Sequence, residues 1–584
     1  MVKSQEALIV FQKHNPQGKL FDSRTAVNDR KKRKIDTSWA AVFQKDIYPV
    51  LIGMEDQFAD FFHPTQGRPN HGVAMMLGTI LLKHMFDFTD AMTVESFNFN
   101  VLWHQALGID LYDCNLCRKT LYNFQSCLNT SRHHESLFNA IRDQIITKAS
   151  LKTGRQRMDS VHIRSNMASL GRFRLFSRTI EQFLRDLQKR AIAAEMDDVS
   201  DLIDRYLSRD GYFCDPRPSE ARGKIQTAAE DLHRLVTLFE LDESVVEMDS
   251  YQLMRRLFRE QCAVSDTSIT VIDKPSSDSL QNPSDPDAGY SGYKGQGYQA
   301  QVSETSVVDN PFEVITAVKV ESACDSDSPA MMETIRDIQD QGMELEEMLA
   351  DTSYGSQDNV EAAAVEGVNL ISPASGARNQ TDGRMSLDSF QFEESGKRMI
   401  CCPVGHPPVY QRYRNRNEKG TADFLESQCC GCVHQDSCVA RILNAGIRRV
   451  TWKRKQGALS YRRQIQQTTD FKEKYRARSG IEATFSQLGN THGGKHLRVR
   501  GFPAVNGATR MNFMAINVRR YIRYVLERIK SMSPTSSDRF SRQFLHPIIS
   551  KMGHFLVQAL FQTGFFKRTV RNHIILRLGS GIAS

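Results

Sequence analysis

Long apolar runs are missing from this chain of 584 residues. The nearest approach, MGHFLVQALFQTGFF near the C-terminus, is too short to cross a bilayer and is interrupted by polar residues. The N-terminus, MVKSQEALIV, lacks the charged region followed by an apolar region that marks a secretory signal. We therefore expect no membrane partner and no export, and a cytoplasmic location is the favoured interpretation.

A large excess of one charge is also missing, because the formal net charge is only +8. The charges are unevenly distributed, however. Residues 180–360 lean acidic, whereas basic residues clearly outnumber acidic ones over 405–530. A basic stretch of this length favours a polyanionic partner. The alternative is an ordinary solvated surface.

Disulfides are not expected either. Without a secretory signal, the 12 cysteines should be thiols or metal ligands. Four of them have spacing that suits a closed tetrahedral zinc site, namely Cys402, Cys429, Cys432 and Cys438. Cys401 and Cys430 are substitutes, and His406 and His434 are possible ligands. Buried thiols, or a site for another metal, are the alternatives.

The periodicity of apolar residues predicts a mixed α/β protein. Residues 1–150 read as helices, and RQRMDSVHIRS (155–165) alternates like a strand. Long amphipathic helices follow, and residues 264–292 are rich in Ser, Asp and Pro, as loops are. Two strands that form a hairpin, a helix, a strand, a helix and a last strand complete a sheet with covering helices.

Three carboxylates occupy notable positions in this order. Asp159 lies on the first strand, Asp351 comes at the end of a later strand, and Glu482 lies on a helix that would pack against the same sheet. Such acids can converge at one edge of the sheet and bind Mg²⁺, which prefers oxygen ligands. For Asp351, in LADTSYGS, the alternative is a structural turn between strand and helix.

Five segments then resemble, in order, those of bacterial insertion-sequence transposases of the DDE class. They are GRPNHGVAMMLGTILLKHMFDFTD with FNFNVLWHQALGIDL, MDSVHIRSNMASLGRFRLFSRTIEQFLRDL, SDPDAGYSGYKGQGYQAQVSET, LADTSYGSQDNVEAAAVEGVNLISP and RSGIEATFSQLGNTHGGKHLRVRG. The resemblance implies a ribonuclease H-like catalytic domain. It also implies that Asp159, Asp351 and Glu482 are the catalytic acids and hold Mg²⁺, with Mn²⁺ as a substitute.

The resemblance further implies a domain organisation. It consists of a helical DNA-binding domain at 1–150, a ribonuclease H-like core at 151–174 and 293–374, a helical insertion at 175–263, a loop or linker at 264–292, a Cys-rich insertion at 375–475, core helices at 476–530 and a C-terminal tail at 531–584.

The implied activity is DNA transposition. The protein would bind the element's terminal inverted repeats, cleave DNA by metal-assisted hydrolysis and join the 3′-OH ends to target DNA by transesterification. It would act as a homodimer on paired ends in the bacterial nucleoid. The alternatives are an inactive, transposase-derived DNA-binding protein and a ribonuclease H-like nuclease without strand transfer.

The helix with the third acid shows one departure from the family pattern. Tyr475, Arg478 and Glu482 keep the expected spacing, but position 489 is Gly where many relatives have Lys. Lys495 or His492 would then supply the basic role. Arg478 and Glu482 are four residues apart, so they should share a helix face. Arg478 would then lie near the scissile phosphate or hold Glu482, and the alternative is a plain surface ion pair. Phosphate contacts are predicted for Tyr475, Arg478, Lys495, Arg498 and Arg500.

Overall fold

The computed structural model describes most of the chain. The described residues are 11, 13–14, 27–63, 70–110, 115–131, 133–190, 197–208, 221–265, 268–376, 385–443 and 446–532. Contacts divide the chain into two compact units, Met1–Ile522 and Arg523–Ser584. The predicted C-terminal tail, apart from its first two residues, lies outside the described residues. No helix among the described residues is long and apolar enough to cross a membrane.

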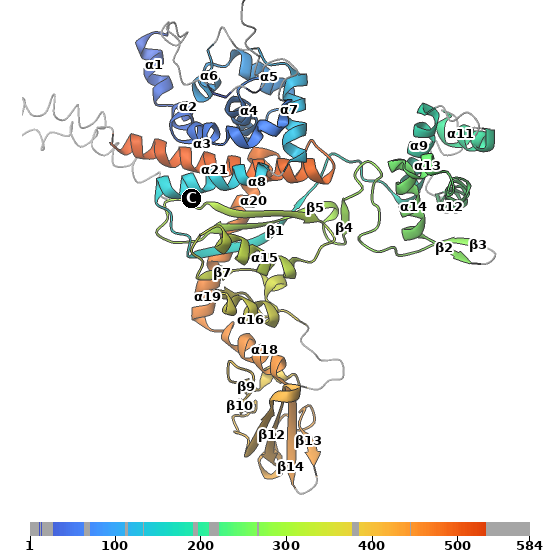
Figure 1. The fold of residues 1–584 in the computed structure, drawn as a ribbon. Coiled ribbons are helices and arrows are strands. Elements are labelled where there is room, and N and C mark those ends of the chain that lie inside the picture. Colours follow the sequence, from blue (N-terminus) through green and yellow to red (C-terminus); the bar gives the residue numbers. More distant parts are fainter. Residues whose placement is uncertain are drawn as a thin grey trace, which may run out of the picture. The chain divides into compact units, whose positions relative to one another are not determined.

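The N-terminal region is helical, as predicted (Figure 1). Its elements are α1 (Asp29–Asp36), α2 (Trp39–Val42), α3 (Tyr48–Gly53), α4 (Val73–Phe86), α5 (Asp90–Phe99), α6 (Val101–Leu107), α7 (Arg118–Thr130) and α8 (His133–Ala149). Helix α4 is buried over most of its surface, so it forms the centre of this region. Helix α7 is different, because it buries only Leu121, Phe124 and Leu128.

A mixed sheet forms the centre of the first compact unit. Its strands are β1 (Arg155–Ile163), β4 (Gly289–Ser291), β5 (Gly295–Thr305), β6 (Ile315–Ser322), β7 (Glu347–Leu349) and β8 (Asn369–Ile371). Strand β5 pairs antiparallel with β1 on one side and with β4 and β6 on the other. Strands β1, β7 and β8 are mutually parallel. The predicted mixed sheet with covering helices is therefore confirmed.

Helices cover this sheet. Met158 and Met348 from the strands pack with Ile335 of α15 (Asp327–Asp340) and Ala363 of α16 (Gln357–Val365) in one apolar cluster. Helix α20 (Ile481–His492) contacts β1. The last described helix is α21 (Phe502–Met532). Its buried Asn517 accepts from the backbone nitrogen of Ile315 and donates to its carbonyl, both at 2.8 Å, and so caps the start of edge strand β6.

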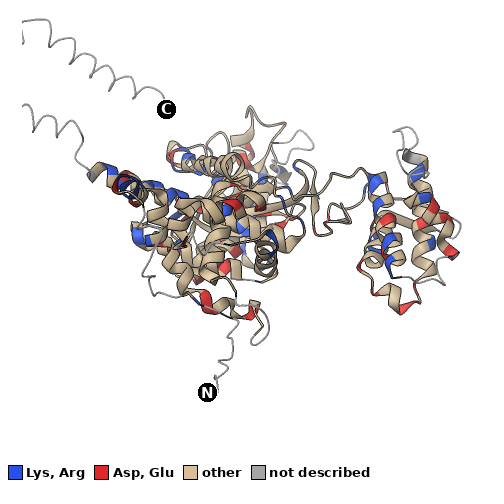
Figure 2. Cartoon of the chain, turned by 90° about the horizontal axis from the view of Figure 1, so that it is seen from above, with Lys and Arg blue, Asp and Glu red and all other residues tan. Residues whose placement is uncertain are grey.

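The helical insertion consists of α9 (Arg172–Lys189), α11 (Ser200–Leu207), α12 (Ala221–Leu238), α13 (Glu243–Val246) and α14 (Asp249–Gln261). It has an apolar core of its own, which includes Phe183, Leu232 and Leu257. Its helices carry side chains of both charges (Figure 2). The segment predicted as a loop or linker contains a hairpin, β2 (Cys262–Ser265) and β3 (Ser268–Val271), because β-branched residues there outweigh the polar composition.

The Cys-rich segment (residues 385–453) contains strands that its sequence did not predict. A four-stranded antiparallel sheet has the order β11 (Tyr410–Arg414), β12 (Lys419–Leu425), β14 (Ile447–Lys453) and β13 (Arg441–Leu443). The pair β9 (Gln391–Phe392) and β10 (Met399–Cys401) and the helix α17 (Glu426–Cys429) accompany it. A small core includes Phe392, Phe424 and Trp452. Helix α18 (Arg454–Ile465) leads out of the segment.

Candidate active site

Asp159 lies in the middle of β1 and is half-buried. Its Oδ1 accepts a hydrogen bond from the backbone of Ser160 at 2.9 Å, and its Oδ2 accepts from Arg478 at 2.5 Å. Burial raises the pKa of Asp159 to about 6; the charge of Arg478 opposes this rise, and the negative charge of Asp351 adds to it. Asp159 and Asp351 are thus close enough to repel each other.

Asp351 comes two residues after the end of β7. Its Oδ1 accepts from the backbone nitrogen of Ser353 at 2.8 Å and so caps a short 3₁₀ turn, Thr352–Tyr354. The next residue, Gly355, needs to be glycine because a Cβ there would lie 1.9 Å from the carbonyl oxygen of Pro373. The turn expected from the sequence is therefore present, and it holds Asp351 beside Asp159.

Glu482 is the second residue of α20, and its side chain is 69% exposed. Arg478 lies 3.7 Å from Glu482 and also pairs with Asp159. The prediction that Arg478 and Glu482 share one helix is wrong in detail. Tyr475 lies in the last turn of α19 (Thr469–Arg476), Arg478 lies in a 3₁₀ turn (Ala477–Gly480), and Glu482 lies in the first turn of α20. The turn still leaves the guanidinium between two of the predicted acids.

The donor set of this neighbourhood suits a hard divalent cation, because it consists of carboxylate oxygens. The Arg478 guanidinium already shows that positive charge is accommodated between Asp159 and Glu482. Within the described ranges, however, no three His, Cys, Asp or Glu side chains are arranged to hold a metal ion as they stand. The residues fit Mg²⁺ in kind, whereas this conformation does not offer it a closed site.

A buried carboxylate fixes the turn and α20 against the sheet. Glu304 on β5 is fully buried and pairs with Arg157 of β1 at 2.7 Å and with Arg520 of α21 at 3.1 Å. Thr484 of α20 donates to it at 2.6 Å. Arg157 also donates to the carbonyl of Ala477, in the turn that carries Arg478, at 2.9 Å. Glu304 therefore positions both Arg478 and Glu482.

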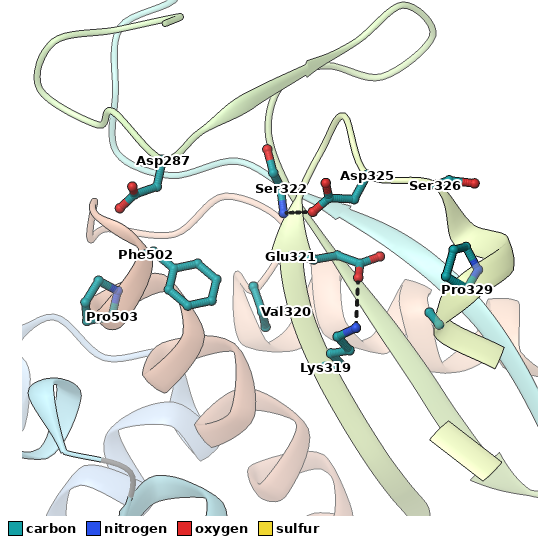
Figure 3. Close-up of a pocket in the computed structure, with 11 residues that line it drawn as sticks. Asp287, Lys319, Val320, Glu321, Ser322, Asp325, Ser326, Pro329, Phe502 and Pro503 are labelled. Atoms are coloured by element: carbon teal, nitrogen blue, oxygen red, sulfur yellow. Dashed lines mark hydrogen bonds and ion pairs between the residues drawn. The ribbon is translucent and has the colours of Figure 1, made fainter. Parts of the chain in front are cut away.

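A second polar connection runs behind Asp351. The hydroxyl of Tyr354, which is fully buried, donates to Gln301 of β5, and Gln301 donates to Glu321 at 2.8 Å. Glu321 also lies 3.5 Å from Lys319 and faces a cavity of about 680 Å³ beside β6 (Figure 3). The wall of this cavity is thus linked by side-chain hydrogen bonds to the turn after Asp351.

The predicted phosphate-binding residues fall into two groups. Tyr475 is half-buried. Burial raises its pKa, and the negative charges of Asp351 and Asp159 add to that rise. Lys495 lies along Gly489 of α20, since a Cβ at Gly489 would be 3.1 Å from its Cδ. Arg498 pairs with Asp87 at 2.7 Å, while Arg500 is exposed. Tyr475 and Arg478 therefore belong with the acids, whereas Lys495, Arg498 and Arg500 follow α20.

Lys495 is the better replacement for the lysine missing at position 489. Its stem covers the surface that the Gly489 side chain would have occupied. His492 is buried, its Nδ1 lies 2.9 Å from the carbonyl oxygen of His84, and burial lowers its pKa to about 4. A neutral, enclosed imidazole cannot serve as a cation for phosphate near neutral pH.

The cysteines predicted as zinc ligands lie around one small cavity, of about 30 Å³. Its lining includes Cys402, Cys429, Cys432 and Cys438, together with His406 and His434. Burial raises the pKa of the Cys429 thiol; Arg448 opposes this rise and the other three thiols add to it. The substitute Cys430 is exposed and does not line the cavity, nor does Cys401. The structure thus separates the four thiols from both substitutes.

Sequence reasoning missed the residues that hold the site in place. Arg157, Glu304, Thr484 and Arg520 come from four different elements, and none belongs to a local motif. One signal was available in GYQAQVSET, where Gln299, Gln301 and Ser303 recur at every second position of a strand whose last nine residues are all buried. Polar residues at buried strand positions need partners, which indicates a polar network.

Comparisons with known proteins agree with the sequence resemblance. Residues 46–127 match the family described as Transposase domain (DUF772), and residues 401–522 match the family described as Transposase DDE domain. The second match includes Glu482 and the Cys-rich segment's cysteines, whereas Asp159 and Asp351 lie outside both ranges. No curated protein matches the chain.

One solved structure that matches is described as the piggyBac transposase synaptic complex with hairpin DNA. It is 12% identical, with a TM-score of 0.22, and the match covers 69% of this chain and 74% of that chain. A likeness of this extent does not establish a shared fold. The two family matches are the firm result, and they indicate that the chain is similar to insertion-sequence transposases of the DDE class in these two segments.

Proposed function

We propose that the protein cleaves DNA strands at the terminal inverted repeats of its element and joins the freed 3′-OH ends to target DNA. A ribonuclease H-like core would carry this activity. The order β6–β5–β1–β7–β8, antiparallel around β5 and parallel from β1 to β8, supports that assignment. Asp159, Asp351 and Glu482 are assigned as the catalytic acids.

The observation that carries the proposal is the position of Arg478. It pairs with Asp159 at 2.5 Å and lies 3.7 Å from Glu482, while Asp351 acts electrostatically on Asp159. Three acids from distant parts of the sequence therefore share one charged neighbourhood. A plain surface ion pair does not account for this arrangement, because the side chains of Arg478 and Asp159 are only 18% and 15% exposed.

The residues divide the work of the reaction. Asp159, Asp351 and Glu482 would hold Mg²⁺, or Mn²⁺ in its place, and a bound divalent ion supplies an activated water and stabilises the leaving oxygen. Arg478 is placed to bind the scissile phosphate once it is released from the acids. Lys495, Arg498 and Arg500 would position the DNA backbone, and Tyr475 would lie beside the reacting strand.

A cleavage assay in Mg²⁺ tests the proposal. The wild-type protein should nick duplexes that carry the element's ends, and Asp351→Asn should abolish nicking while leaving DNA binding intact. Asp340→Asn is the matched control, since Asp340 is exposed at the far end of α15. Should wild type and Asp351→Asn bind equally and neither cut, the protein is an inactive DNA-binding descendant of a transposase.

Strand transfer separates a transposase from a nuclease. Duplexes that are already cut at the element's 3′ end, incubated with a target plasmid, should give joined products. Hydrolysis of the target without joining would favour a ribonuclease H-like nuclease.

Metal binding has a test that does not depend on activity. If the acids hold Mn²⁺, a saturating concentration should raise the thermal unfolding temperature of the wild type, because a ligand at about 100 times its Kd contributes about 2.7 kcal/mol. Asp351→Asn should lose this rise and Asp340→Asn should keep it. An equal rise in all three proteins would mean that the ion binds elsewhere.

We also propose a structural zinc ion in the Cys-rich segment. It is supported by the four thiols that line one small cavity, although they would have to move together to close around the ion. Buried Arg448 supports it too, because its Nε has no hydrogen-bond partner among the described residues and its charge favours the thiolate form of Cys429. Four thiolates around Zn²⁺ carry a net negative charge that such an arginine offsets.

A further inference from the structure

One face of α7 carries no acidic residue. The helix reads RKTLYNFQSCLNT, and its exposed side chains include Arg118, Lys119, Asn123 and Ser126. Gln125 is partly exposed. Asn129, one helical turn further along, is partly exposed too. Neither Gln125 nor Asn129 forms a side-chain hydrogen bond with the described part of the chain. The helix therefore presents two cations and free amides without any carboxylate nearby on its own surface.

A groove of about 900 Å³ runs along this helix. Tyr122, Gln125 and Asn129 line it from α7, and Arg498 and Arg500 line it from the segment after α20. The carboxylates in the groove, Asp87 and Asp90, are neutralised by Arg498 and Lys83 respectively. Arg500 makes no ion pair with any described residue, which leaves its charge available for a ligand.

The groove is continuous with the segment that follows β1. Asn166 lines it, and its backbone nitrogen donates to the carbonyl oxygen of Val499 at 2.8 Å. Arg164, two residues before, forms a parallel bridge with His496. DNA in the groove would thus lie beside the segment that extends β1, the β-strand that carries Asp159.

The dimensions and chemistry suit duplex DNA. Thirteen residues of α7 span about 20 Å. The major groove of B-DNA, about 12 Å wide, admits one helix, and Asn, Gln, Arg and Lys are the side chains that read adenine and guanine edges there. A protein partner is less suitable, because Tyr122 is the one large exposed apolar or aromatic side chain on α7.

We propose that α7 enters the major groove of the DNA at the element's end and reads its bases, an inference that rests on the proposed function. The phosphate backbone of one DNA strand would then occupy the protein groove beside Arg498 and Arg500. Gln125 and Asn129, which are one helical turn apart and both line the groove, contact base edges. Arg500 contacts phosphate.

Selection of binding sites from a library of random-sequence duplexes tests this assignment. The experiment uses full-length protein with Asp351→Asn, so that no DNA is cut. The parent should enrich one sequence motif. The added double substitution Gln125→Ala and Asn129→Ala should lower the preference for that motif over shuffled DNA by about 10-fold or more, because lost base contacts remove discrimination. Its affinity for shuffled DNA should not change.

Two single variants complete the design. Cys127→Ala is the matched control, because Cys127 is two residues after Gln125 and so points to the other side of α7; it should keep the motif. Arg500→Ala should weaken binding to motif and shuffled DNA equally, and flatten the slope of log affinity against log salt by about one.

The outcomes separate this inference from the proposed function. If the parent enriches a motif and the double variant enriches it equally, α7 does not read bases, although a transposase that recognises its ends through other residues remains. If the parent enriches no motif, end recognition itself is refuted and the inference with it. A loss of preference in Cys127→Ala as large as in the double variant would indicate damage to the helix and contradict direct reading.

Discussion

A carboxylate without solvent exposure, Glu304, joins the central sheet to the helices that follow the Cys-rich segment. Its two arginine partners come from β1 and α21, and its hydroxyl partner comes from α20. Gly480 is part of the same joint, since a Cβ there would lie 2.2 Å from the Arg157 guanidinium. A charge buried in this way is tolerated only while all its partners remain in place.

Glu304→Ala should therefore destabilise the protein by roughly 3–5 kcal/mol, because it leaves two arginines beside each other without their counter-charge. Urea unfolding followed by tryptophan fluorescence would measure the change. Glu473→Ala, at an exposed position on α19, is the control and should stay within about 0.5 kcal/mol of the wild type. Similar urea midpoints for Glu304→Ala and Glu473→Ala would show that Glu304 does not hold the sheet and these helices together.

Acid should loosen the contact between α4 and α20 through His492. Burial lowers its folded-state pKa to about 4, below the value of about 6.5 expected in the unfolded chain. The unfolded state therefore binds the proton first. Its contribution to stability is complete above pH 6.5 and decreases as the pH falls from 6.5 towards 4, by about 2 kcal/mol at pH 5. His84, whose pKa burial lowers to about 3, acts with the same sign.

Hydrogen exchange of peptides from α4 and α20, corrected for intrinsic rates, would detect this effect. Protection should fall between pH 8 and pH 5 in the wild type, and fall less in His492→Asn. His233→Asn, in the helical insertion, should behave like the wild type. A pH dependence that is unchanged by His492→Asn would assign the effect to other groups.

At the scale of elements, the periodicity of apolar residues was enough to predict the strands β1, β5 and β6 and the helices α15 and α16. It failed in the Cys-rich segment, where strands such as IRRVTWK are short and place a charged residue, Arg448, on the buried side. The candidate acids could be placed on elements from the sequence. Their link through Arg478 could not, because it depends on a 3₁₀ turn between two helices and on Arg157 holding that turn.

Zinc content should distinguish the two classes of cysteine in the Cys-rich segment. The purified wild type should carry about one zinc per chain, and Cys432→Ser should lose it, because a closed tetrahedral site needs all four ligands. Cys430→Ser is the matched control, since Cys430 is an exposed neighbour outside the cavity. Elemental analysis of both variants measures this directly, and zinc-free wild type would leave the four thiols as a reduced core.

At the scale of the molecule, the first compact unit depends on contacts between strands in the middle of its sequence and α21 at its C-terminal end. The partners of Glu304 and of the edge strand β6 include Arg520 and Asn517, which come from α21. A chain divided into fragments 1–376 and 385–584 should therefore reassemble when the two are expressed together, and the first fragment alone should be insoluble.

Co-purification through a tag on one fragment would measure the reassembly. Glu304→Ala in the first fragment should reduce the yield of the second, whereas Asp340→Ala should not. Soluble, monomeric 1–376 with a cooperative unfolding transition would contradict the dependence on α21.

The late position of Arg478, Glu482 and Arg520 has a consequence during synthesis. A ribosome releases Asp159 and Asp351 long before these residues emerge. A nascent or prematurely terminated chain then contains Asp159 and Asp351 without Glu482. It also contains Glu304 without Arg520, one of its two arginine partners. On the proposed function, cutting activity would thus be withheld until translation is nearly finished, and incomplete copies of the protein would not cut the DNA around them.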